Sequence, residues 1–387
     1  MIDLSADQKR ALMALMDWFE DDQKQAFITM GGFAGTGKTT LISLLRQKLH
    51  QKDKKIRVAF CSFTGKATRV LKSKLIEAES IHSQDTVGTI HSLIYSPIIN
   101  DKKEITGWKT KEEIELDLLI IDEASMVDEK IWSDLLSYRI PIIAVGDHGQ
   151  LPPIRGSFNL MEHPLIKLNE IHRQARNNPI IELSILAREL GKIPIGIFGA
   201  GVKKIARNKP ESGEEVEEIL RKHRLDTLIL CGYNSTRIKL NQFIRGNLER
   251  NPFIPEPGDR VICLRNNHSK GIYNGMLGTV ISLEAKNENY YDAEIKMDGE
   301  SDNFIGPISN KQFNLTEPLN FGPRRSTTLK IDLFDYGYAL TVHKAQGSQA
   351  KKVILFEERF PKMDEEMWRK WLYTGITRAE EELLLVG

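Results

Sequence analysis

The chain has 387 residues, 41% of them hydrophobic and 28% charged, which is typical of a folded protein with two or three domains. No apolar run reaches the roughly 20 residues of a membrane helix, and the N-terminus lacks the basic and apolar blocks of a signal peptide. The three cysteines form no CxxC pair, which argues against a zinc site or a disulfide framework. The net charge of +1 provides no global attraction for a polyanion. We therefore expect a cytoplasmic protein without membrane contact.

Helix and strand patterns alternate along the first 150 residues. Ser5 can cap a helix with apolar residues at helical spacing, and a second helix begins near Lys38. Nearly continuous apolar runs predict four strands, at residues 26–30, 57–62, 116–121 and 140–145. Such runs are typical of parallel strands that helices cover on both faces. The pattern predicts a doubly wound α/β domain.

A second set of elements follows Pro152. Asn178 and Pro179 supply the cap and the first-turn proline of a helix that ends at Gly191. A second α/β sheet would be built from strands at residues 227–231, 337–342 and 352–356. Residues 251–330 differ in character, because short apolar stretches alternate there with Asn-Gly, Asn-Glu-Asn and Asp-Gly turns. This part of the chain predicts a small β-barrel insert.

Residues 32–39, GFAGTGKT, fit the phosphate-loop pattern GxxxxGK(S/T). Glycines let the backbone turn its N–H groups towards phosphates, Lys38 neutralises charge on the outer phosphates, and the Thr39 hydroxyl is a magnesium ligand. The alternative is a flexible glycine-rich turn. Because the loop follows a predicted strand and opens a predicted helix, the context favours the phosphate loop.

Two further strands end in polar residues suited to the same site. Asp122 and Glu123 end the run at 116–121, and such a pair can bind magnesium and activate the attacking water. Without a phosphate loop, the pair would more often begin a helix. Gln150 follows the next strand and could report the γ-phosphate, although a tight Gly-Pro turn explains its segment equally well.

Three other residues each have two interpretations. Gln8 completes a capping box with Ser5, and it also suits a glutamine that reads adenine. Arg173 and Arg378 follow the expected first domain, and an arginine supplied by a second domain stabilises a phosphoryl transition state in known systems. Without further context, each arginine would more often be a surface or ion-paired residue.

Taken in order, these motifs resemble those of superfamily 1 helicases, and most closely the RecD-like branch (superfamily 1B) with Dda and the Pif-type enzymes. The order is more specific than any single motif, and the resemblance covers nearly the whole chain. The segments that carry it are residues 32–40, 121–125, 146–153, 168–174, 341–347 and 373–378. Residues 258–267 and 274–280 resemble the SH3-like domain of that branch.

The resemblance implies two RecA-like domains, at residues 1–160 and at 161–250 with 331–387, and an SH3-like insert at 251–330. It implies an ATP-dependent DNA helicase that moves 5′ to 3′ on single-stranded DNA and acts at single/double-strand junctions. Mg²⁺ would accompany ATP, and the protein partners are unknown. The direction rests on the resemblance alone, because no single residue encodes it.

The resemblance also assigns roles to individual residues. The nucleotide contacts would be Gln8, Gly32, Gly35, Thr36, Gly37, Lys38, Thr39, Thr40 and Gly347. The metal ligands would be Thr39 and Asp122, and the catalytic residues Lys38, Glu123, Gln150, Arg173 and Arg378. The DNA contacts would be Thr64, Lys66, His91, Thr341 and His343. Hydroxyl and imidazole donors on loops at strand ends suit phosphate contacts, which position a strand without reading its sequence.

Residues 92–115 lie where that branch carries a strand-separating β-hairpin. Two β-prone pieces flank a polar turn at residues 100–103, which predicts a hairpin, and a surface loop without a role is the alternative.

Two other functions are left open by the sequence. A GTPase would need the guanine-reading motif Asn-Lys-x-Asp, and the nearest approach is residues 208–211, where Glu211 follows a proline. A translocase or clamp would use the same ATPase motifs without separating strands.

Overall fold

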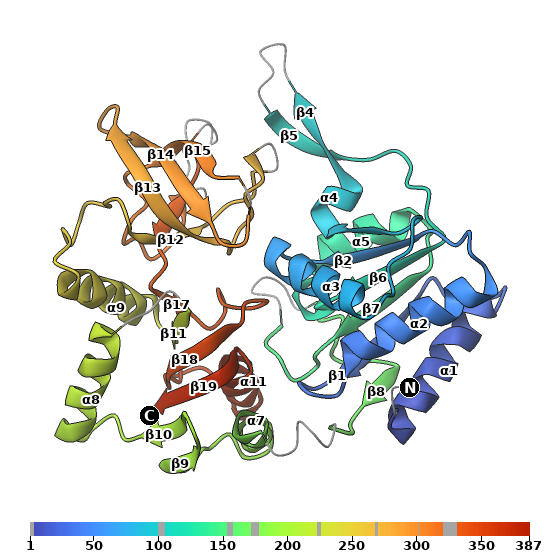
Figure 1. The fold of residues 1–387 in the computed structure, drawn as a ribbon, viewed down its shortest axis with the longest axis horizontal. Helices are drawn as coiled ribbons and strands as arrows, with labels where there is room; N and C mark the ends of the chain where they lie inside the picture. Colours follow the sequence, from blue (N-terminus) through green and yellow to red (C-terminus); the bar gives the residue numbers. More distant parts are fainter. Residues whose placement is uncertain are drawn as a thin grey trace. The chain divides into compact units, whose positions relative to one another are not determined.

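The computed structural model describes residues 4–99, 105–152, 158–171, 178–222, 226–267, 270–300, 302–319 and 331–387. The chain folds as two compact units, Met1–Glu182 and Leu183–Gly387 (Figure 1). No helix in the described ranges is both long enough and apolar enough to span a membrane.

A six-stranded parallel sheet forms the centre of the first unit. Its strands are β1 (Phe27–Gly32), β2 (Val58–Ser62), β3 (Thr86–Thr89), β6 (Leu118–Asp122), β7 (Ile142–Gly146) and β8 (Ile166–Leu168). Their spatial order is β3-β2-β6-β7-β1-β8. The four predicted strands are confirmed as β1, β2, β6 and β7. Because β8 pairs with β1, with Ile166 opposite Met30, the sheet extends past the domain end predicted at residue 160.

Helices cover both faces of this sheet. They are α1 (Ala6–Glu20), α2 (Lys38–Lys52), α3 (Gly65–Glu77), α4 (Ile90–Ile94) and α5 (Glu129–Ser137). The first three share one hydrophobic core with Phe60 of β2, whereas α4 and α5 share another with the next residue, Cys61. Successive side chains of a strand point to opposite faces, so the two cores lie on opposite sides of the sheet. The doubly wound α/β domain is confirmed.

A two-stranded antiparallel hairpin projects from the first unit (Figure 1). Strand β4 (Tyr95–Ile99) follows α4 directly, and β5 (Ile105–Thr110) returns alongside it. Tyr95 lies opposite Thr110, and Pro97 lies opposite Trp108. The pairing expected within residues 92–115 is therefore present, and residues 100–104 of the turn lie outside the described ranges.

The second unit contains its own six-stranded sheet. Its strands are β9 (Gly196–Gly199), β10 (Val202–Ile205), β11 (Thr227–Cys231), β17 (Ala339–Thr341), β18 (Ala350–Phe356) and β19 (Ala379–Val386), in the order β17-β11-β18-β19-β10-β9. All pairs are parallel except β9 with β10. Its helices are α7 (Pro179–Leu190), α8 (Pro210–Arg221), α9 (Asn234–Asn247) and α11 (Glu365–Ile376). The predicted strands at 227–231, 337–342 and 352–356 are confirmed, with small shifts at their ends.

A five-stranded antiparallel sheet accounts for the predicted β insert. Its strands are β12 (Arg260–Cys263), β13 (Leu277–Ala285), β14 (Tyr290–Met297), β15 (Phe304–Ser309) and β16 (Phe334–Tyr336), in the order β15-β14-β13-β12-β16. Because β16 pairs with β12, the sheet continues past residue 330, where the insert was predicted to end.

Helix α9 joins the two sheets of the second unit. Arg237 of α9 donates to Asp335 beside β12 at 2.6 Å, and Arg245 donates to both oxygens of Asp259 at 2.9 and 3.0 Å. The side chains of both pairs are at most 1% exposed. One hydrophobic core also runs through both sheets, from Ile229 of β11 outward. The five-stranded sheet is thus fixed to the second α/β sheet.

The segment that approaches a guanine-reading motif forms the start of a helix. Lys209 is the N-cap residue of α8, and Pro210 is its first residue, with Glu211 in the first turn. Proline is favoured at this position because its missing N–H would have no partner inside the helix. The sequence of residues 208–211 is therefore explained by helix initiation.

Candidate nucleotide and nucleic-acid site

The phosphate-loop sequence forms a tight turn between β1 and α2. Gly35 and Gly37 have φ of 79° and 77°, a left-handed conformation that favours glycine. A Cβ atom on Gly32 would come within 2.6 Å of the Thr36 hydroxyl. Thr36 closes the turn with backbone and hydroxyl bonds to the Phe33 carbonyl, at 3.3 and 2.8 Å. The loop therefore leads directly into the N-terminus of a 15-residue helix, where backbone N–H groups favour an anion.

Three predicted contact residues, Lys38, Thr39 and Thr40, form the first turn of α2. The Lys38 ammonium donates to the carbonyls of Gly32 and Phe33, at 2.6 and 3.1 Å. A phosphate would compete well for this ammonium, because it would replace neutral carbonyl acceptors with a charged one. Within the described residues, no protein group bonds the Thr39 hydroxyl.

Asp122 and Glu123 lie at the end of β6, as predicted. Asp122 accepts a hydrogen bond from the Glu123 backbone N–H at 2.9 Å. Burial raises the pKa of Asp122, and the nearby charge of Lys38 lowers it. Lys38 and Asp122 therefore interact electrostatically, although β7 separates their strands. Glu123 has φ of 55°, a strained value for a residue other than glycine, and such strain concentrates at functional sites.

Gln150 lies in the turn after β7, between the phosphate loop and the acidic pair. Its backbone N–H donates to the Asp147 carbonyl at 3.2 Å, and its side-chain amide nitrogen lies 3.4 Å from the Asp147 carboxylate. The side chain is buried, and its amide oxygen has no hydrogen-bond partner in the described part of the chain. The same turn contacts the phosphate loop, since the His148 and Phe33 rings lie 4.2 Å apart.

Gln8 takes part in a capping box and also contacts the phosphate loop. Its Oε1 accepts from the Ser5 backbone N–H at 3.0 Å, and its own N–H donates to the Ser5 hydroxyl at 3.4 Å. The capping interpretation is therefore confirmed. Its Nε2 donates to the Thr36 carbonyl at 2.9 Å, a contact that the sequence did not reveal. Adenine recognition by Gln8 stays a prediction.

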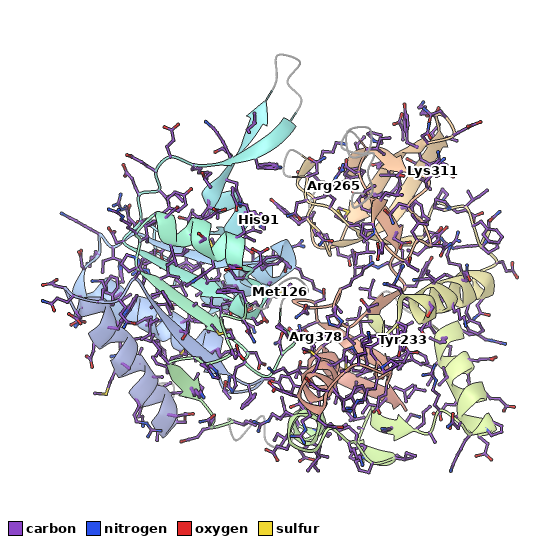
Figure 2. The ribbon with its side chains drawn as sticks, turned by 180° about the vertical axis from the view of Figure 1, so that it is seen from behind. His91, Met126, Tyr233, Arg265, Lys311 and Arg378 are labelled. Carbon is purple, nitrogen blue, oxygen red and sulfur yellow. The ribbon has the colours of Figure 1, made fainter. Side chains whose placement is uncertain are left out.

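The predicted DNA contacts of the first unit follow β2 and β3. Thr64 is the N-cap residue of α3 and accepts from the Ala67 N–H at 3.1 Å, with Lys66 in the first turn. His91, on α4, has its ring near those of Phe63 and Tyr95, at 5.8 and 5.6 Å. Burial lowers its pKa, which favours the neutral imidazole. Figure 2 shows His91 near the base of the hairpin.

The second unit holds four of the predicted site residues. Thr341 ends β17 and His343 follows it, with a pKa that burial lowers. Gly347 has φ of 71°. Arg378 is buried after α11 (Figure 2) and donates to the carbonyls of Thr374 and Ser348, at 3.0 and 3.3 Å, and to the Thr377 hydroxyl. Arg173 lies outside the described residues.

Arg378 is an unusual buried cation. Its hydrogen-bond partners in the described ranges are all neutral oxygens, and no carboxylate pairs with it there. A buried charge without a counter-ion is costly, so an anion that reached this guanidinium would be bound favourably.

Two serines near the acidic pair were not singled out from the sequence. Ser62 lies directly opposite Asp122 in the pairing of β2 with β6, and Ser125 follows Glu123 by two residues. Both hydroxyls are buried, and neither has a hydrogen-bond partner in the described ranges. For Ser62 the available signal was a serine at the end of an apolar run, which is common in sequences and therefore weak.

The carboxyl edge of the first sheet gathers all these loops in a definite order. The loops after β1, β7 and β6, which are neighbouring strands, carry Lys38, Gln150 and Asp122. The loops after β2 and β3, at the other end of the sheet, carry Thr64 and His91. These predicted nucleotide and DNA residues of the first unit thus occupy adjacent parts of one edge.

Comparisons with known proteins identify the family of the chain. The family model described as an AAA domain matches residues 3–197, and the model described as a UvrD-like helicase C-terminal domain matches residues 336–386. The chain belongs to the superfamily 1B helicases of the RecD, Dda and Pif1 group. The AAA-domain match spans the phosphate loop, the acidic pair and the hairpin.

Individual relatives of this helicase chain span bacteria and phage. It is 28% identical over 383 residues to the ATP-dependent RecD2 DNA helicase of Deinococcus radiodurans, and the match covers 93% of this chain and 47% of that one. It is 23% identical over 452 residues to the ATP-dependent DNA helicase dda of Enterobacteria phage T4, covering 99% of both. The chain thus spans about half the length of RecD2.

Solved structures show the same fold. A crystal structure of Bacteroides Pif1 bound to single-stranded DNA aligns with a TM-score of 0.54 at 19% identity, covering 100% of this chain and 92% of that one. A structure of Pif1 helicases at forked double-stranded DNA aligns with a TM-score of 0.55 at 18% identity, with the same coverage.

Proposed function

We propose that this chain is an ATP-dependent DNA helicase that moves 5′ to 3′ along single-stranded DNA and unwinds duplex at single/double-strand junctions. The observation that carries the proposal is the carboxyl edge of the first sheet. Loops suited to ATP and loops suited to a phosphate backbone follow neighbouring strands there. The relatives RecD2 and dda, both named as ATP-dependent DNA helicases, support the same function.

The ATP chemistry follows from the residues around the phosphate loop. Lys38 would neutralise charge on the outer phosphates, and Gln150 would bond to the γ-phosphate through its buried amide. Glu123 would orient and deprotonate the attacking water. The Thr39 hydroxyl and the Asp122 carboxylate are oxygen ligands of the kind that Mg²⁺ prefers. When bound, Mg²⁺ would neutralise charge on the phosphates.

Two arginines, Arg173 and Arg378, would complete the site, and Arg378 belongs to the second unit. Arg378 is already buried among neutral oxygens, so the γ-phosphate is a suitable anion for it, and Arg173 would act beside it. An arginine of this kind contributes roughly 10³–10⁵ in rate in known phosphoryl-transfer enzymes. Gly347 would contact the nucleotide, and Thr341 and His343 would contact the DNA backbone. Single-stranded DNA that bridges both units would then favour the closed, hydrolysing state.

The hairpin β4–β5 would separate the strands. A base-pair step contributes a mean of about 1.4 kcal/mol of stacking, so a motor that pulls one strand needs only a rigid obstacle to part it from the other. The hairpin follows α4, which carries His91, and therefore begins where the proposed DNA track ends.

Unwinding of tailed duplexes tests the proposal. With ATP, a duplex that carries a 5′ single-stranded tail should be unwound, and a duplex with only a 3′ tail should stay intact. The opposite preference would contradict the proposed direction. ATPase turnover without unwinding of either duplex would favour a translocase or clamp, and ATPase turnover that single-stranded DNA does not increase would contradict a DNA motor altogether.

A further inference from the structure

Two tyrosine hydroxyls join the base of the hairpin to α5 and to the residue that follows it. The Tyr138 hydroxyl, just after α5, lies 3.0 Å from the Ile94 carbonyl and 2.9 Å from the Lys111 carbonyl. The Ile94 carbonyl directly precedes β4, and the Lys111 carbonyl directly follows β5. The Tyr138 hydroxyl therefore contacts both ends of the hairpin. The Tyr95 hydroxyl, at the start of β4, donates to the carboxylate of Asp134 on α5.

Further contacts close the same base. The Lys111 N–H donates to the Ile94 carbonyl at 2.8 Å, and the Lys111 ammonium donates to the Ser92 carbonyl at 2.9 Å. Lys130 of α5 bonds to Asp134 at 2.8 Å and lies 5.6 Å from the centre of the Tyr95 ring. Lys111 therefore joins the two ends of the hairpin to each other, and Asp134 and Tyr138 join them to α5 and its C-terminal end.

Such support is needed because the hairpin has only two strands. In the described residues, β4 and β5 form a sheet of their own and pair with no other strand. An isolated two-stranded hairpin is marginally stable in water, so its angle is set by whatever holds its base. A hairpin that tilts under load would not keep two DNA strands apart.

The helix that holds the hairpin is also attached to the acidic pair. After Glu123 the chain forms a short turn, and α5 begins at Glu129 with Asp128 as its N-cap residue. Ala124 and Ile131 of this segment share one hydrophobic core with Ile94 and with the partly buried Tyr95. A displacement of the acidic segment would therefore move α5 and the base of the hairpin together.

We infer that Tyr95, Asp134 and Tyr138 are positioning residues that fix the hairpin on α5 and transmit movement of the acidic segment to it. The inference rests on the proposed function, because it assumes that the hairpin parts the strands. The Tyr95 backbone N–H caps α4 by donating to the His91 carbonyl, but the side-chain hydrogen bonds of the three residues reach neither the phosphate loop nor a predicted DNA-contact residue. Their loss should therefore uncouple unwinding from ATP hydrolysis and leave hydrolysis intact.

The test compares unwinding with DNA-stimulated ATPase in the same preparations. Tyr138→Phe and Tyr95→Phe each remove one hydroxyl and keep the ring, so the fold is retained. Each should slow unwinding of the tailed duplex by about fivefold, which corresponds to about 1 kcal/mol and to the contribution of one hydrogen bond. ATPase turnover on single-stranded DNA should stay at the wild-type level, so less duplex is opened per ATP.

Two controls make the result specific. Tyr233→Phe removes a hydroxyl that donates to the Arg359 carbonyl at 3.1 Å in the second unit, and both rates should be unchanged. Asp134→Asn keeps an oxygen that accepts from Tyr95, so it should unwind faster than Asp134→Ala. A merely destabilising effect would instead lower ATPase turnover and unwinding in parallel, and that outcome would overturn the inference.

A variant with a Gly-Ser linker in place of residues 97–107 separates the two proposals. If this variant loses unwinding while Tyr95→Phe and Tyr138→Phe unwind normally, the hairpin parts the strands but the tyrosines do not position it. If the linker variant unwinds at the wild-type rate, the hairpin does not separate the strands. The proposed role of the hairpin and the proposed role of the tyrosines in positioning it are then both wrong.

Discussion

The Gln8 side chain donates to the carbonyl of Thr36 across 28 residues of sequence, which ties the first helix to the phosphate loop. The same amide completes the capping box with Ser5. One buried side chain thus stabilises a helix terminus and holds the nucleotide loop.

These two roles of Gln8 can be separated by substitution. Ser5→Ala should cost about 1 kcal/mol of stability through the lost cap and leave the KM for ATP unchanged. Gln8→Ala should cost a similar amount and also raise the KM for ATP, because the phosphate loop loses its bond to α1. Steady-state ATPase assays and urea unfolding of both variants check this, and equal KM values would show that Gln8 only caps its helix.

Substitutions of Lys38 and of Glu123 should impair the ATPase reaction at different steps. Lys38→Ala should abolish hydrolysis while single-stranded DNA binding survives, since Thr64 and His91 follow other strands. Glu123→Gln should still bind ATP and lose turnover by roughly 10²–10⁴, the usual contribution of general acid–base catalysis. Fluorescent-nucleotide binding and ATPase assays distinguish the two variants. A Glu123→Gln protein unable to bind ATP would contradict the role of Glu123 as the water activator.

The buried carboxylate of Asp259 should be among the most sensitive positions for stability. It accepts from Arg245, from the Tyr338 hydroxyl at 2.9 Å and from the Glu256 N–H at 2.7 Å. Asp259→Asn should lower the free energy of unfolding of the second unit by about 3–5 kcal/mol, because it leaves Arg245 buried without its counter-ion.

An exposed ion pair of the same sheet provides the control for Asp259. Glu284, 71% exposed, pairs with Lys286 on the surface, and Glu284→Gln should change stability by about 0–1 kcal/mol. Urea unfolding checks both variants, and similar effects at the two positions would show that burial of the Arg245 pair is unimportant.

Lys344 should make stability depend on pH in the alkaline range. Burial lowers its pKa to about 8 from 10.5, and the charge of Arg237 lowers it further, whereas Asp335 and Cys231 raise it. Between these two pKa values the unfolded chain holds a proton that the folded chain has lost, so the contribution of Lys344 to stability rises with pH, by up to about 1.4 kcal/mol per pH unit.

Lys344→Met isolates this effect from other alkaline titrations. At pH 7 the folded wild type carries a desolvated charge, so the variant should be the more stable of the two. The difference should shrink as the pH rises above about 8, since Lys344 then becomes neutral in the folded state. Urea unfolding at several pH values measures it, and a difference that is independent of pH would contradict the lowered pKa.

The sequence predicted those parts of the fold that depend on local pattern. The runs that became β2, β6 and β7 are nearly continuous apolar segments, and all five residues of β2 are buried. In contrast, β3 has an exposed first residue and no apolar run, and β8 has three residues, so neither has a local signal. Both strands depend on pairing with a neighbour that lies far away in the chain.

In the candidate site, too, the features that depend on local sequence were predictable, and the contacts between distant residues were not. The phosphate loop and the acidic pair were predictable because each is contiguous and has a fixed spacing. The bond from Gln8 to Thr36 and the support of the hairpin by Tyr138 were not, because they join residues 28 and 44 positions apart. A tyrosine after a helix is chemically ordinary, and only its two carbonyl partners give it a role.

The position of β1 between β7 and β8 has a consequence for biosynthesis. Phe27 pairs with Ile142, and Met30 pairs with Ile166, so β1 gains both neighbours only after more than a hundred further residues have been made. A nascent chain that ends before Leu168 would carry the complete phosphate-loop sequence on an unsupported strand. Ribosome-bound chains should therefore acquire nucleotide affinity late, and the exposed apolar edge of β1 would until then require protection by a chaperone.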